Sequence, residues 1–103
     1  MVETIEIEIL RPVNPTGVSF MRYIYGAVAA RERDIITTHK KKFVKLMQKL
    51  GFLIEDKVGS GKLITGKIII EVDENKEPIK AIAEDIKVWN IVKEIKERIE
   101  AEE

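Results

Sequence analysis

Residues 38–51, THKKKFVKLMQKLG, hold five lysines and no carboxylate. Lys41, Lys45 and Lys49 recur every four residues, a spacing that places them on one face of a helix. Ammonium groups without a carboxylate partner attract phosphate, so this stripe predicts contact with a nucleic-acid backbone. Neighbouring basic residues extend the prediction to a candidate anion-binding set of Arg31, Arg33, Lys41, Lys42, Lys45 and Lys49.

The charges of the chain sum to zero, but they are unevenly distributed. Residues 1–37 carry −1, residues 38–68 carry +6, and residues 69–103 carry −5. The middle of the chain therefore attracts anions locally, although the whole does not. An alternative interpretation is that Glu6, Glu8 or the acidic last third covers the lysines within the fold, or that water simply solvates them.

His39, the only histidine, is the one residue suited to general-base catalysis near neutral pH. No serine, cysteine or carboxylate pair at a catalytic spacing accompanies it, so a small enzyme using His39 is the weakest functional hypothesis. Residues 58–63, VGSGKL, resemble a phosphate-binding loop only superficially. That motif requires a glycine where Asp56 stands and a hydroxyl where Leu63 stands. We interpret the segment as a hairpin turn, and we predict no metal and no cofactor.

A second functional hypothesis concerns residues 23–30, YIYGAVAA, which carry no charge. A helix without a polar face is enclosed by its own fold or covered by another chain. We therefore expect a non-enzymatic interaction protein that forms a homodimer through helix 20–30, with nucleic-acid binding as the alternative. The candidate interface comprises Phe20, Tyr23, Tyr25, Gly26 and Val28, with Gly26 allowing a close approach.

Hydrophobic periodicity predicts a strand followed by two helices in the first half of the chain. Residues 4–10, TIEIEIL, alternate apolar and acidic side chains, as a strand with one buried face does. Residues 18–34 show helical spacing and are predicted to form the first helix. The second helix is predicted over 35–50, with Asp34 as its N-cap and Gly51 as its C-cap.

The second half predicts three strands and a final helix. Residues 52–58 and 63–72 are predicted to form a hairpin across the glycine turn. Residues 79–85 fit either a strand or a helix that continues into the last one, and we predict a strand over 78–86 because an alternating apolar stretch after a tight turn usually pairs back. In residues 86–103, apolar side chains recur at helical spacing. Oppositely charged residues stand at i and i+4, where they can form ion pairs on a helix surface. Both features favour a helix.

The resulting order, β-α-α-β-β-β-α, predicts an α+β domain over residues 1–103 with a mostly antiparallel sheet and helices on one face. A winged-helix-like core over residues 20–72 is the alternative, because helix, helix, strand, turn and strand follow one another there.

Composition sets the broad class. Among 103 residues there are 17 Ile, 14 Glu and 13 Lys, but one Gln and three Asn, a bias typical of proteins from thermophiles. The absence of cysteine removes disulfides and thiolate chemistry. No apolar run approaches the roughly 20 residues of a membrane span, so we predict a cytoplasmic protein that makes no contact with membranes.

Overall fold

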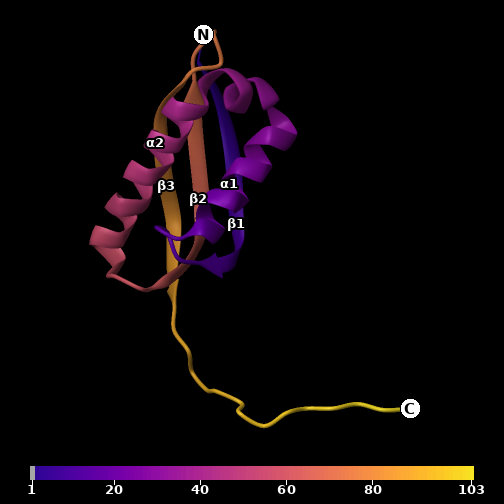
Figure 1. Cartoon of the computed structure of the whole chain (residues 1–103). Coiled ribbons are helices and arrows are strands. Elements are labelled where there is room, and N and C mark those ends of the chain that lie inside the picture. Colours follow the sequence, from indigo (N-terminus) through magenta and orange to yellow (C-terminus); the bar gives the residue numbers. More distant parts are fainter. Residues whose placement is uncertain (1) are drawn as a thin grey trace.

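The computed structural model describes residues 2–103 and shows an α+β fold, as predicted. The elements are β1 (Glu3–Val13), α1 (Val18–Arg31), α2 (Arg33–Val58), β2 (Leu63–Val72) and β3 (Pro78–Trp89). The strands form one antiparallel sheet in the order β1-β2-β3. Both helices lie on the same face of this sheet, and the other face is open (Figure 1).

The alternation of β1 produces the buried face of the sheet. Ile5, Ile7 and Ile9 are buried, whereas Glu6 and Glu8 are exposed on the opposite face. The central strand β2 adds Ile64, Ile68, Ile70 and Val72, all fully buried. Each such aliphatic side chain stabilises the fold by about 1.5–3 kcal/mol when it leaves water.

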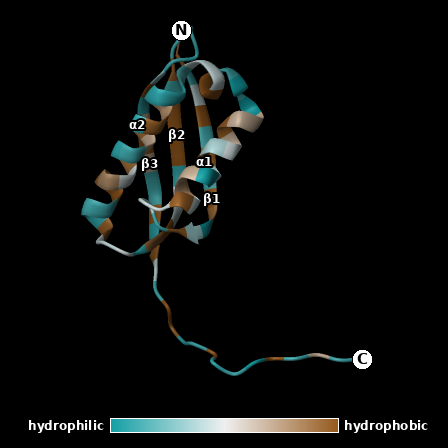
Figure 2. Cartoon of the chain, in the orientation of Figure 1, coloured by the Kyte–Doolittle hydropathy of each residue, from teal (hydrophilic) through white to brown (hydrophobic). Residues whose placement is uncertain are grey.

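The helices place their own apolar stripes on that face. Phe20, Ile24 and Val28 follow at four-residue intervals along α1 and are fully buried. Phe43 and Met47 do the same in α2, as part of the same core cluster. The middle of β2 is strongly apolar and lies between the two helices in this view (Figure 2).

The predicted end of the second helix at Gly51 is wrong, and so is the strand over residues 52–58. Instead, α2 continues to Val58 and ends at Gly59, which has a φ of 101°. Gly51 is buried, and a Cβ atom there would overlap the carbonyl oxygen of Pro15. The glycine therefore permits close packing of helix and loop and does not cap the helix.

Two further predictions, the winged-helix-like core and the N-cap of the second helix, are also wrong. The glycine turn at 59–62 joins a helix to a strand, so the hairpin required by a winged-helix-like core over residues 20–72 is absent. The predicted N-cap, Asp34, lies in the first turn of α2, and the N-cap position belongs to Glu32.

The strand predicted over 78–86 is confirmed, but the final helix over 86–103 is wrong. Strand β3 continues to Trp89, whose indole Nε1 donates a hydrogen bond of 2.8 Å to Thr65 Oγ1 on β2. Ile86 lies over Gly66, where a Cβ atom would meet its side chain. These cross-strand contacts fix both residues in the sheet. Residues 90–103 form neither helix nor strand and extend away from the body of the protein (Figure 1).

The two edge strands of the sheet differ in whether side chains cover their backbone hydrogen-bonding groups. On β1, the Tyr23 hydroxyl donates to the Glu8 carbonyl at 2.7 Å and lies 3.5 Å from the Leu10 amide, while Arg31 donates to the Glu6 carbonyl. Side chains of α1 thus occupy backbone groups that another strand would otherwise pair with. On β3, within residues 2–103, no side chain bonds the backbone, and a bulge at Asp85 with a φ of 55° interrupts the edge.

Gly51 and Gly26 provide a matched pair of tests for this packing. Replacing Gly51 by alanine places a methyl group against Pro15, so we expect a loss of about 1–3 kcal/mol in the free energy of unfolding. The same change at Gly26, which has open space around it, should stabilise α1 by up to about 1 kcal/mol. Urea unfolding at equal protein concentration measures both. A Gly51→Ala protein as stable as the parent would contradict the buried contact.

Lys76 joins the start of β1 to the junction of the helices. Its ammonium lies 2.6 Å from a Glu3 oxygen and 3.4 Å from a Glu32 oxygen. The hydrogen bond to Glu3, followed by the charges of both carboxylates, raises the pKa of Lys76 above its ordinary value. Because the folded state holds this proton more tightly, its stabilising effect is complete below the ordinary lysine pKa and is lost as pH rises through the raised value.

We therefore expect Lys76→Met to lower the unfolding midpoint at neutral pH, and the difference from the parent to shrink above about pH 10.5. Thermal unfolding across that range measures it. Lys87→Met is the control, since Lys87 is exposed and forms no ion pair within residues 2–103. A Lys76 effect that stays constant through the alkaline range would show that the ammonium is not its cause.

Candidate nucleic-acid interface

A kink at His39 divides α2 into a short first part and a long second part. His39 has a φ of −120° and a ψ of 32°, which is not helical. Its Nε2 lies 3.0 Å from the backbone oxygen of Asn75, in the turn between β2 and β3. A carbonyl oxygen only accepts, so Nε2 holds the proton in this bond. The histidine therefore ties α2 to the β2–β3 turn.

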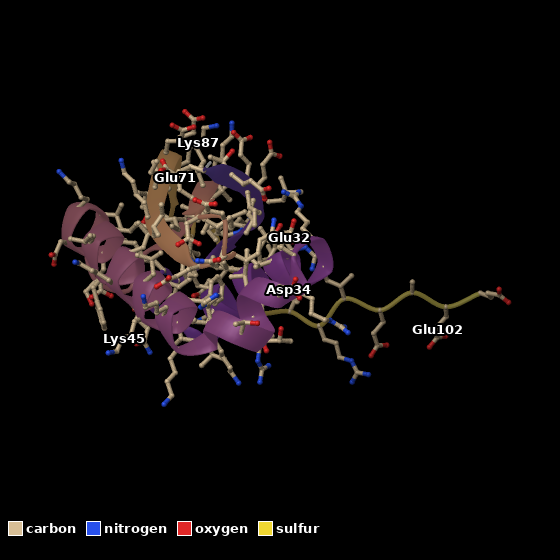
Figure 3. All side chains as sticks on the ribbon, turned by 90° about the horizontal axis from the view of Figure 1, so that it is seen from above. Glu32, Asp34, Lys45, Glu71, Lys87 and Glu102 are labelled. Atoms are coloured by element: carbon tan, nitrogen blue, oxygen red, sulfur yellow. The ribbon has the colours of Figure 1, made fainter. Side chains whose placement is uncertain are left out.

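The lysine stripe lies on the continuous part of α2 beyond the kink. Lys41, Lys45 and Lys49 are all exposed, and none forms an ion pair or a hydrogen bond with any residue from 2 to 103. Each four-residue step separates them by about 6 Å along the helix axis. Lys45 lies on the helix side of the molecule, away from Glu71 and Lys87 on the sheet side (Figure 3).

The remaining predicted basic residues are placed less favourably for a shared anion site. Lys42 forms an ion pair with Glu77 at the end of the β2–β3 turn. Arg31 turns toward the edge of β1, and Arg33 is exposed at the start of α2, before the kink. The structure therefore brings together Lys41, Lys45 and Lys49 as a row and leaves the two arginines apart from it.

The carboxylates considered as neutralising partners do not reach the row. Glu6 and Glu8 lie on the open face of the sheet, where Glu8 is opposite Lys67 and Glu6 lies 4.0 Å from the Lys67 ammonium. The acidic residues of 90–103 extend away from α2 (Figure 3). Glu77, in the last third, does reach α2, where it forms an ion pair with Lys42.

Phe52 is the residue on this face that the sequence prediction missed. It is 60 % exposed, and it follows Lys49 by three residues and Lys45 by seven, which places all three on one side of α2. The wrong strand over 52–58 concealed this relation. The signal was present, because the buried positions Leu50 and Ile54 continue the helical spacing through Gly51.

Most residues of the predicted dimer interface pack within the single chain. Phe20 and Val28 are fully buried in the core. Tyr23 bonds to β1, and the ring of Tyr25 packs edge-on against Phe43 at a centroid separation of 6.3 Å. Of the five residues, only Gly26 is exposed.

The chain matches no known protein family, and comparisons with characterised proteins and with solved structures gave no match. Within residues 2–103, no helix has the length and apolar character needed to cross a membrane.

Proposed function

We propose that the protein is a non-enzymatic binding module that contacts the phosphate backbone of nucleic acid through Lys41, Lys45 and Lys49. One observation carries the proposal. These three ammonium groups stand in a row without a partner in the described chain, whereas Lys42 and Lys76 have carboxylate partners. A row of like charges on one helix face repels itself and is stabilised when an anionic polymer lies along it.

The neighbouring side chains favour a single strand over a duplex. Phe52 is exposed beside Lys49, and an aromatic ring next to a basic row can stack on an unpaired base. Direct readout of a duplex groove relies largely on arginine, asparagine and glutamine at base edges, and of these types Gln48 lies beside the row. Lysine mainly positions phosphate, so the proposed binding is weakly dependent on sequence.

Composition supports a cytoplasmic location in a heat-adapted cell as part of this proposal. A chain without cysteine and rich in Ile, Glu and Lys fits the cytoplasm of a heat-adapted cell. Homodimer formation is a second candidate property. It is favoured by apolar side chains that the single chain leaves exposed, namely Leu53, Ile79, Ile91, Val92, Ile95 and Ile99.

Glutamine at Lys41, Lys45 and Lys49 together removes three charges while keeping good helix formers. The slope of log affinity against log salt changes by about 0.7 for each phosphate contact to a single strand, so we expect the slope to become shallower by about 2. Fluorescence anisotropy with a labelled oligothymidylate, titrated between about 50 and 200 mM salt, measures this slope.

A triple variant at Lys62, Lys80 and Lys87 is the control, since it makes the same charge change away from the row. Its slope should remain close to that of the parent. Two results would contradict the proposal: no binding at the lowest salt, or an equal change of slope in both triple variants.

Phe52→Ala tests stacking separately from charge. We expect binding to weaken by about 1–3 kcal/mol, the usual value of one stacked base, with no change in the salt slope. An oligonucleotide of abasic sites should bind the parent and the variant equally well. If the variant loses the same affinity for both oligonucleotides, Phe52 does not stack on a base.

A further inference from the structure

A seam between α2 and β3 runs along the side of the molecule and contains two hollows. The first, of about 320 Å³, is lined almost entirely by apolar side chains, including Leu53 and Ile54 of α2 and Ala83 and Ile86 of β3. The second, of about 420 Å³, contains Leu46 and Ile79. Because α2 and β3 run in the same direction here, the two hollows follow one another along the seam.

The two hollows differ in charge. Lys42, Lys45 and Lys49 surround the second hollow, with Glu77 as its acidic residue. The first hollow has one charged residue, Lys57. A ligand that fits the whole seam is therefore apolar along one side and acidic at one end.

Residues 90–103 of the same sequence have this character. Ile91, Val92, Ile95 and Ile99 are between 57 % and 98 % exposed, because the segment runs away from the body of the protein. Their spacing is helical, and they stand among hydrophilic residues (Figure 2). The segment ends in EAEE, residues 100–103.

The segment also has the side-chain pairs of a stable helix surface. Lys93 and Glu97, Glu94 and Arg98, and Lys96 and Glu100 stand at i and i+4. A short isolated helix is marginal in water unless its apolar face is covered. The extended segment in the single chain is therefore consistent with a helix that forms only when it docks.

The lengths of the two surfaces correspond. Residues 91–103 as a helix would be about 20 Å long. The seam from Ile79 to Ile86 spans seven residue-to-residue steps of strand, or about 23 Å. With Ile91, Val92 and Ile95 in the apolar hollow, the acidic end lies beside the lysines of the second hollow.

The connection to β3 indicates which copy supplies the helix. Strand β3 remains paired through Trp89, opposite Leu63, so a helix starting at Ile91 leaves only Asn90 to reverse the chain. Loops between a strand and a helix usually need two to six residues. A tail that cannot turn back onto its own seam reaches the seam of another molecule.

We propose that residues 91–103 fold as an amphipathic helix in the α2–β3 seam of a second copy, so that two chains exchange tails reciprocally. The exchange is symmetric, since each chain gives one tail and receives one. It covers the side of the sheet where β3 lacks the side-chain cover that α1 gives to β1. The interface differs from the one predicted on helix 20–30.

Light scattering coupled to gel filtration of the full chain, at micromolar concentration, tests the exchange. We expect a mass of two chains for the parent and one chain for Ile95→Asp. Leu53→Ser, in the seam, should raise the dimer dissociation constant at least tenfold. Leu10→Ser is the matched control, because Leu10 is 72 % exposed on β1, at the opposite edge of the sheet from the seam, and it should leave dimerisation unchanged. A monomeric parent, or equal effects of the two serine variants, would overturn the proposal.

Cysteine cross-linking distinguishes exchange from docking within one chain. Because the chain has no cysteine, Leu53→Cys and Ile95→Cys can be made in separate proteins and mixed under mild oxidation. We expect a covalent pair that joins the two different variants. A second protein carries both cysteines in one chain. If a disulfide forms only in this protein, and within a monomer, the tail occupies its own seam and the second copy is excluded.

Discussion

Two helices must cover one face of three strands, and the way they divide that face determines the rest of the molecule. Helix α1 packs on β1 and also reaches over its edge with Tyr23 and Arg31. Helix α2 packs on β3, whose inward residues Ala81 and Ala83 are small and stay partly exposed. The β1 side is therefore closed within the chain, whereas the β3 side retains a seam. The exposed face of α2 carries the lysine row, and Lys45 and Lys49 also border the seam.

The strand and helix periods predicted most of this architecture, because burial on one face imposes them directly on the sequence. Predictions failed where a residue type has two structural uses. Glycine ends helices, but it also lets a helix pack closely against a loop, and Gly51 does the latter against Pro15. Ile86 and Trp89 fit a helical spacing, yet Gly66 and Thr65 hold them in the sheet. These partners are distant in the sequence, so no local pattern reveals them.

In the candidate site, too, local spacing predicted some features and tertiary contacts determined the others. That Lys41, Lys45 and Lys49 share a face followed from their spacing alone. That Lys42 does not belong with them depends on Glu77, which only the fold brings beside it. Phe52 joined the site once α2 was seen to continue through Gly51. Local spacing thus predicted the charges, whereas tertiary contacts decided which of them remain available.

The lysine row and the seam share α2, and this has a thermodynamic consequence. Lys45 and Lys49 belong to the row and also line the second hollow of the seam. If an acidic tail neutralises them, fewer cations remain for phosphate, and the salt dependence of nucleic-acid binding falls accordingly. Linkage is reciprocal, so phosphate bound to these lysines weakens the hold of the seam on the tail to the same extent. Self-association and nucleic-acid binding would then oppose one another through a shared pair of ammonium groups. Leu53 lines the apolar hollow and Phe52 lines neither hollow, so each would serve only one of the two functions.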